Sequence, residues 1–170
     1  MLKLLVKKSV FLGLLFFSLV SGCFTLRAQN QAQIIDWKFL SHVEFKDKYF
    51  AEYEAWYLVP VFDKKVKALD GQQIMIKGYL IPMDVEGGKY ALSAYPFSAC
   101  FFCGGAGPET VISLQFDEKP KRFETDEYLT FTGKLKLNSS DFDEFSYILE
   151  SAKPLKKWLK NIGGPFLPLL

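Results

Sequence analysis

The sequence predicts a mainly β protein built around one small barrel, and two observations support this. Five runs of residues have the composition and alternation of β-strands, and turn residues separate them. Two of these runs contain an interior glycine, Gly78 and Gly133, which in a strand often marks a bulge or a sharp barrel bend. Closing the sheet into a barrel would also remove the exposed edges that such hydrophobic strands would otherwise present.

The first four predicted strands follow the turn signal Asp70-Gly71. They cover residues 73–82, 90–95, 110–116 and 129–137. The last of these has the clearest period of two, because leucine or phenylalanine alternates with threonine or lysine, so one face is expected in a core. The residues expected to share that core are Leu129, Phe131, Leu135, Leu137, Ile74, Ile76, Ile112 and Leu114.

The end of the barrel is less regular in sequence. Residues 142–149 match a helical stripe and a strand equally well. A turn over 138–144 followed by a strand to about residue 151 is favoured, because this strand would close the sheet. Five bent strands joined by turns are typical of a barrel of the OB type. We therefore expect a single OB-like domain over residues 34–152, with a short helix and tail over 153–170.

An aromatic-rich segment precedes the barrel, over residues 34–62. It is expected to be helical or extended, and its many aromatic side chains are expected to cover one end of the domain, since aromatic residues normally serve as core. The alternative is a surface aromatic groove that binds a partner.

The first 28 residues have the three parts of a secretory signal: lysines, an uncharged apolar run and small residues. Cleavage after Ala28 would leave Gln29 as the first residue. Residues 20–23 also resemble the lipobox of bacterial lipoproteins, and in that case the signal is 1–22 and Cys23 is the lipidation candidate. Either cut exports the protein, to the periplasm or to the outer membrane, and only a lipid on Cys23 would attach it to a membrane.

Export changes the charge balance. The signal contains four of the 21 basic residues and no acid, so 17 basic and 19 acidic residues remain and the net charge falls from +2 to −2. A basic footprint for nucleic acid is absent, so nucleic acid is not an expected partner.

The most distinctive stretch of the chain is residues 100–109, Cys-Phe-Phe-Cys-Gly-Gly-Ala-Gly-Pro-Glu. Its three glycines and a proline exclude a continuous helix or strand, so it is expected to be a shaped loop. In an exported protein Cys100 and Cys103 could form a disulfide. They could also be a reactive redox pair, although no helix follows them at once to lower a thiol pKa.

The third alternative is a metal site. Two thiolates at this spacing make up half of a tetrahedral zinc site, and soft thiolates also suit copper(I). Further ligands would have to come from the single histidine, His42, from a carboxylate such as Glu109, or from a second subunit. A lone histidine is more often an ordinary residue than a ligand, so His42 is a weak candidate.

Several of these stretches also resemble a known family. Residues 69–71 (Leu-Asp-Gly), 78–82 (Gly-Tyr-Leu-Ile-Pro), 100–105 and 108–109, together with Trp37 and Pro60-Val61-Phe62, resemble an uncharacterised family of secreted Gram-negative envelope proteins, a domain of unknown function. The resemblance spans about Ile34 to Ser151. It implies a signal peptide followed by an OB-like β-domain, and it implies no reaction.

The sequence therefore favours an exported, non-enzymatic envelope protein, which would use the loop around Cys100 and Cys103 to bind a metal or a protein partner. A thiol-disulfide redox protein is the alternative. No Ser-His-Asp or Cys-His arrangement can be built from one histidine beyond coincidence.

Overall fold

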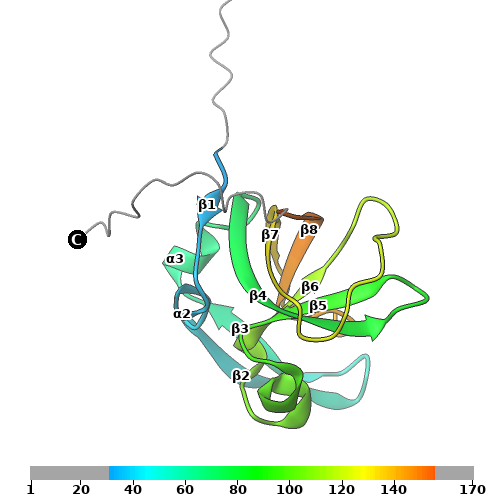
Figure 1. The fold of residues 1–170 in the computed structure, drawn as a ribbon. Helices are drawn as coiled ribbons and strands as arrows, with labels where there is room; N and C mark the ends of the chain where they lie inside the picture. The colour runs from blue at the N-terminus through cyan, green and yellow to red at the C-terminus, as the bar shows by residue number, and fades with distance from the viewer. Residues whose placement is uncertain (1–30, 156–170) are drawn as a thin grey trace, which may run out of the picture.

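The computed structural model describes residues 31–155 (Figure 1). The predicted signal, with Cys23, and residues 156–170 of the predicted helix and tail lie outside this range. Within it, no helix combines the length and the apolar character needed to cross a membrane.

Five strands close into the predicted barrel: β4 (Gln73–Asp84), β5 (Lys89–Ser93), β6 (Val111–Leu114), β7 (Tyr128–Leu137) and β8 (Tyr147–Pro154). They pair in the order β4-β5-β6-β8-β7, and β7 pairs with β4 to complete the ring. All the pairs in the ring are antiparallel except β6 with β8. The mainly β, OB-like class expected from the sequence is confirmed.

Several strand boundaries differ from the expected ones. β5 ends at Ser93 and β6 at Leu114, each two residues earlier than expected. β4 continues through Pro82 to Asp84, with a register shift against β5 between these two residues. β8 continues to Pro154, where it pairs with Phe131 of β7. The first two residues of the predicted C-terminal helix, Lys153 and Pro154, are therefore strand.

The barrel interior contains the core that alternation predicts. Phe131 and Leu135 of β7 are fully buried, together with Ile74, Ile76 and Ile112 of the facing strands. Leu114 belongs to the same cluster, and Leu129 and Leu137 are partly buried against it. Burying a side chain of this size contributes about 1.5–3 kcal/mol relative to leaving it in water, so this cluster is the main source of stability.

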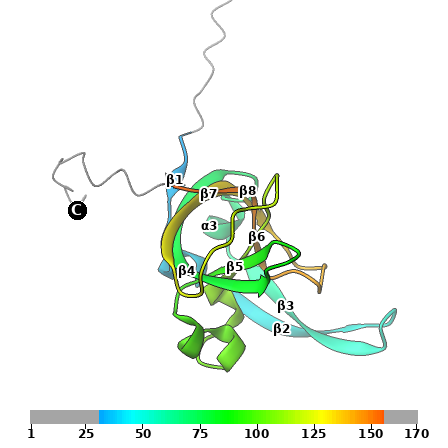
Figure 2. The same cartoon turned by 45° about the vertical axis from the view of Figure 1, so that its right-hand side comes forward.

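The short elements before β4 are β1 (Gln33–Ile34), α2 (Trp37–Leu40) and α3 (Lys64–Lys67). β1 joins the barrel sheet by pairing in parallel with β4, and α3 lies at one end of the barrel (Figure 2). Asp36 and Asp63 cap the two helices, each by accepting a backbone hydrogen bond on its side chain. Through these caps Leu40 and Val66 are placed in the core, where both are fully buried.

Trp37 of α2 packs against β4 at Gly78, where the strand has no side chain. A Cβ built on Gly78 would lie 3.0 Å from the Trp37 ring and 2.5 Å from the carbonyl oxygen of Ser93. The indole nitrogen donates a hydrogen bond to the carbonyl oxygen of Lys77 at 2.8 Å. The interior glycine thus lets α2 and β5 approach the strand closely. The register shift expected of an interior glycine is found at Gly133, between Thr132 and Lys134 of β7 against β8.

The rest of the aromatic-rich segment forms a hairpin, β2 (Val43–Phe50) and β3 (Ala55–Phe62). The two strands pair only with each other among the described residues, and the hairpin extends beyond the barrel (Figures 1 and 2). Phe62 at its base is buried in the core, as expected of these aromatic residues. Tyr49 and Trp56 are exposed, so the outer half does not cover the domain end.

Candidate functional site: the cysteine loop

The segment between β5 and β6, residues 94–110, is called the cysteine loop below. It contains three short 3-10 helices: η1 (Phe97–Ala99), η2 (Phe101–Cys103) and η3 (Pro108–Thr110). Such helices rarely exceed three or four residues, and the glycines and proline between them prevent extension. The sequence expectation of a shaped loop is confirmed. The loop lies at the same end of the molecule as the hairpin (Figures 1 and 2).

The two thiols of the loop converge on one atom. Cys100 Sγ and Cys103 Sγ each donate a hydrogen bond to the carbonyl oxygen of Phe97, both at 3.1 Å. The two sulfur atoms therefore lie no more than twice that distance apart. Cys100 is fully buried and Cys103 is exposed, and in the structure both are free thiols. The pair has one protected sulfur and one that a second molecule can reach.

Glycine is required immediately after the second cysteine. Gly104 has φ = +72°, in the left-handed region, where it ends η2. A Cβ on Gly105 would lie 2.6 Å from the carbonyl oxygen of Ala99, and its amide donates to the carbonyl oxygen of Cys100 at 3.2 Å. The chain therefore folds back tightly over Cys100, which explains why that thiol is buried.

The loop is anchored to the barrel at its start. The Phe97 amide donates to the Asp126 carboxylate at 2.7 Å, and the Asp126 amide donates to the carbonyl oxygen of Leu80 in β4 at 2.9 Å. The carbonyl oxygen that accepts the hydrogen bonds of both thiols thus belongs to Phe97, a residue held to the barrel through its own amide. A site on such a support is pre-organised, since few groups must be ordered when a ligand binds.

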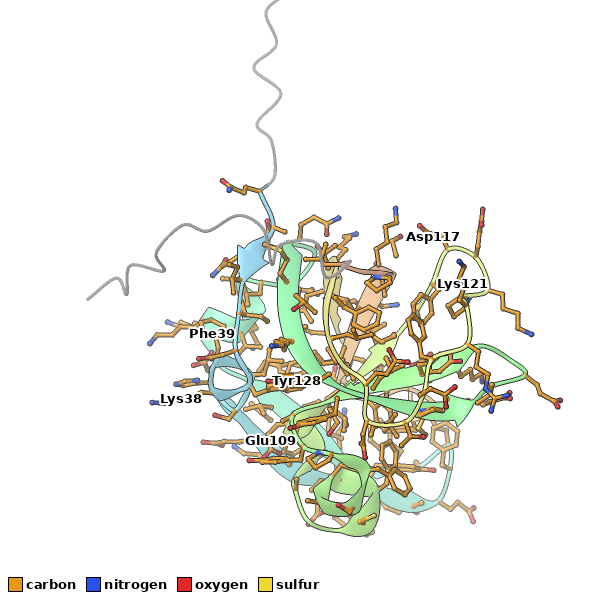
Figure 3. The ribbon with its side chains drawn as sticks, viewed as in Figure 1. Lys38, Phe39, Glu109, Asp117, Lys121 and Tyr128 are labelled. Atoms are coloured by element: carbon orange, nitrogen blue, oxygen red, sulfur yellow. The ribbon has the colours of Figure 1, made fainter. Side chains whose placement is uncertain are left out.

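The two further ligand candidates do not join the cysteines. Glu109 lies in η3, which contacts α2 (Figure 3). His42 is exposed after α2, and its Nδ1 is 3.1 Å from the carbonyl oxygen of Phe39. Across residues 31–155, no three His, Cys, Asp or Glu side chains are grouped closely enough to hold a metal ion. A zinc or copper ion on Cys100 and Cys103 would need ligands from elsewhere.

Glu109 acts electrostatically on a different residue, Tyr147 of β8. The Tyr147 hydroxyl is buried and donates a hydrogen bond of 2.6 Å to the carbonyl oxygen of Leu40. Burial raises the pKa of this hydroxyl well above its usual value, and the negative charges of Glu109 and Asp63 raise it further. Tyr147 is therefore neutral at physiological pH and ties α2 to the barrel.

The cysteine loop also carries exposed aromatic rings. Tyr95, Phe97 and Phe102 of the loop are all exposed, although Phe102 also contacts the partly buried Phe145 with ring centroids 5.6 Å apart. Phe101 contacts Phe145 as well, at 6.3 Å. The β7–β8 loop, residues 138–146, thereby supports the cysteine loop from one side.

The same β7–β8 loop also supports the hairpin, through Phe142. This ring stacks on Tyr57 of β3 at 3.9 Å and meets Phe50 and Tyr53 edge-on. The β7–β8 loop thus contacts one cluster of rings at the cysteine loop, through Phe145, and a second at the hairpin, through Phe142, and we call the two clusters together the aromatic surface. Its members are Phe101, Phe102, Phe145, Phe142, Tyr57, Phe50 and Tyr53.

A groove adjoins this surface on the face of β5 and β6. Its volume is about 590 Å³, and it lies between the β4–β5 turn, the start of the β6–β7 loop and the β7–β8 loop. Phe145 lines it, so one ring belongs to both the groove and the aromatic surface. OB-type barrels commonly bind ligands on this face, between the loops that correspond to these. Asp117, labelled in Figure 3, lines the end of the groove on the β6–β7 loop.

Sequence reasoning did not single out the rings that join the two parts. The favoured turn over 138–144 contains Phe142, in agreement with the structure, whereas Phe145 was expected in the last strand and instead lies in the β7–β8 loop. Their surroundings gave one usable signal, since large apolar residues inside the acidic turn Asp141-Phe142-Asp143-Glu144 have no strand or helix face to occupy. Asn138 holds the turn by donating to the carbonyl oxygens of Asp141, Glu144 and Phe145.

Comparison with known proteins adds little to this site. No known protein-family profile matches the sequence, and no curated protein matches it. A crystal structure of a DUF3299 family protein from Pseudomonas aeruginosa PAO1 is similar at 15% sequence identity and a TM-score of 0.46. The match covers 74% of this chain and 97% of that one.

Proposed function

We propose that this chain is an exported, non-enzymatic envelope protein that binds another envelope protein through the cysteine loop. The observation that carries the proposal is the set of exposed rings on the cysteine loop, Tyr95, Phe97 and Phe102, because exposed rings on a loop fixed to a rigid barrel are the usual anchors of a protein interface. Phe97 and Phe102 stand beside the thiols, and the groove next to Phe145 offers a concave site for a partner side chain.

Export in this proposal rests on the lysines and apolar run at the start of the sequence. Attachment to a membrane would come only from a lipid on Cys23. The net charge of −2 after removal of the signal argues against nucleic acid as the partner.

Metal binding is compatible with the same proposal. Cys100 and Cys103 supply two sulfur ligands, and a tetrahedral zinc or copper(I) site would need more. Because no third ligand is grouped with them in the described chain, the metal version of the proposal also requires a partner, which would complete the coordination shell.

Site-specific photo-crosslinking tests the proposal in intact cells. A photo-reactive amino acid in place of Phe102 is expected to capture one protein of the envelope. The same group in place of Lys121, which is exposed on the β6–β7 loop (Figure 3), is the matched control and is expected to capture nothing specific. Identical products at the two positions, or none at Phe102, would contradict recognition through the loop.

Thiol-disulfide exchange is a second candidate, supported by the convergence of both thiols on Phe97 with Cys103 exposed. The Cys103 thiolate would attack a partner disulfide and form a mixed disulfide, releasing one partner thiolate. The Cys100 thiolate would then displace the second partner sulfur, which leaves this protein oxidised and the partner reduced.

Intact mass and metal analysis of protein from the periplasmic fraction, with and without reductant, separates these possibilities. It reports the cleavage site, the state of the cysteines and any metal together. Rapid reduction of a model disulfide such as oxidised glutathione by the reduced protein would favour the redox candidate. A stable disulfide or a bound metal that survives this treatment would favour the binding role.

A further inference from the structure

The outer half of the hairpin has an uncovered face that is separate from the aromatic surface. Residues directly opposite each other in an antiparallel pair lie on the same face, so Tyr49 with Trp56 and Asp47 with Leu58 share one face. Trp56 is 69% exposed, Leu58 54% and Tyr49 48%. We call these four residues the Trp56 face.

The opposite face of the hairpin already has a partner within the protein. Tyr57 and Phe50 point to that side, and Phe142 of the β7–β8 loop packs on both. In the described chain, by contrast, the Tyr49 and Trp56 rings contact each other, at 5.5 Å, and no ring of the barrel. A two-stranded hairpin is marginal in water, so three large exposed side chains on it indicate an interaction site.

The charges around this face are all negative. Asp47 lies on it, and Glu52 and Glu54 occupy the turn at the end of the hairpin, where both are exposed.

The hairpin lysines lie on the other face and have partners there. Lys46 pairs with Glu44 at 3.3 Å, and the Lys48 ammonium lies 4.7 Å from the centre of the Phe50 ring. A partner on the Trp56 face therefore meets aromatic rings and carboxylates without competing ammonium groups.

Contact through this face is favoured over contact along the strand edges. The edge of β2 carries alternating charges at Lys46, Asp47 and Lys48, and β3 contains Pro60, both of which discourage the addition of another strand.

We propose that the Trp56 face binds a basic, extended segment of another polypeptide. Arginine or lysine side chains of that segment would lie over the Trp56 and Tyr49 rings, whose electron-rich faces attract cations, and near the Asp47 carboxylate. Leu58 would contact the aliphatic part of the same side chains. This inference is independent of the cysteine loop, since the two surfaces share no residue.

The test uses the full chain and a fluorescein-labelled peptide of alternating arginine and leucine, with binding followed by anisotropy. The peptide is expected to bind, and its affinity is expected to fall with added salt because exposed charges are screened. Trp56→Ala and Asp47→Lys are each expected to weaken binding by about tenfold or more, as for anchor residues of an interface. Tyr128→Ala and Glu124→Lys, at exposed positions elsewhere, are the matched controls and are expected to change the affinity less than about twofold.

Four results would overturn the proposal. The first is no binding at about 1 mM peptide, beyond which an interaction is too weak to be specific. The second is equal binding of a peptide with glutamate in place of arginine. The third is dimerisation of the chain that Trp56→Ala abolishes, which would make a second copy the occupant. The fourth is a large gain in affinity when residues 156–170 are removed, which would make this chain's own basic segment the occupant.

Discussion

Strand β7 and the hairpin β2–β3 are both rich in alternating apolar residues, and they use them in opposite ways. In β7 the apolar side chains face the inside of a closed ring, and Phe131 is fully buried. In the outer hairpin the apolar side chains lie beyond the elements that could cover them, and Trp56 is 69% exposed. Alternation thus shows that a strand has two different faces, whereas the elements packed against it decide which face is buried.

The difference suggests a division of the molecule into two parts. The barrel buries its apolar residues and supplies stability. The cysteine loop and the hairpin keep aromatic residues at the surface, where they add little to stability and where, in our proposals, they bind partners. The predictions below challenge this division, beginning with the largest expected effect.

Replacement of Phe131 by alanine should destabilise the barrel. Because the ring is fully buried among other core side chains, the free energy of unfolding should fall by about 3–5 kcal/mol. Urea denaturation measures this change. A loss below about 1 kcal/mol would show that the barrel does not carry the stability assigned to it.

Tyr147→Phe tests the hydrogen bond that links α2 to the barrel. At neutral pH the variant leaves the Leu40 carbonyl group without its donor, so the free energy of unfolding should fall by about 1–3 kcal/mol.

The same variant tests the raised pKa of Tyr147. The contribution of the hydroxyl is fully present below pH about 10, the ordinary tyrosine value, and is lost above it because only the unfolded chain ionises there. The stability difference between wild type and Tyr147→Phe should shrink by about 1.4 kcal/mol per pH unit above pH 10. A difference that stays constant up to pH 11.5, about one and a half units higher, would contradict the raised pKa.

The double replacement Cys100→Ser and Cys103→Ser should leave a folded barrel. Serine can still donate to the Phe97 carbonyl oxygen, and a disulfide closing so short a ring contributes less than about 2 kcal/mol by chain entropy. Thermal unfolding with and without reductant checks this expectation, and the variant should no longer bind metal or the partner. Failure to fold under oxidising conditions would make the pair a structural staple instead.

Trp56→Ala should have the smallest effect on stability, within about 0.5 kcal/mol of wild type, because the ring is mostly in water. Denaturation by urea beside Phe131→Ala gives the comparison on one scale. A loss comparable to that of Phe131→Ala would mean that the hairpin is part of the core.

The barrel could be predicted from the sequence because its signals are local. The alternation of Leu129, Phe131 and Leu135, and the position of Gly78 within a strand, follow from neighbouring residues alone. The predicted core residues accordingly lie in one cluster.

The site could be predicted only in part, because its arrangement depends on contacts between distant residues. The cysteine loop was identified from its composition, but the contact of Phe102 with Phe145 joins residues 43 positions apart. Val43 and Phe45 alternate with charged residues, which is the pattern of a strand. This pattern indicates a hairpin only when the aromatic residues of the segment are not assumed to be core. Proximity of His42 or Glu109 to the cysteines cannot be read from spacing, since it depends on how α2 and η3 pack.

Native-state hydrogen exchange tests the division between barrel and recognition surfaces most directly. Amides of β4 and β7 should exchange only with global unfolding, since these strands enclose the core. Amides of Gly104 and Gly105 in the cysteine loop, and those of the outer hairpin, should open with free energies at least about 2 kcal/mol lower, because few buried contacts hold them. If all three groups instead share one opening free energy, the loop and the hairpin are integral to the fold and the division is wrong.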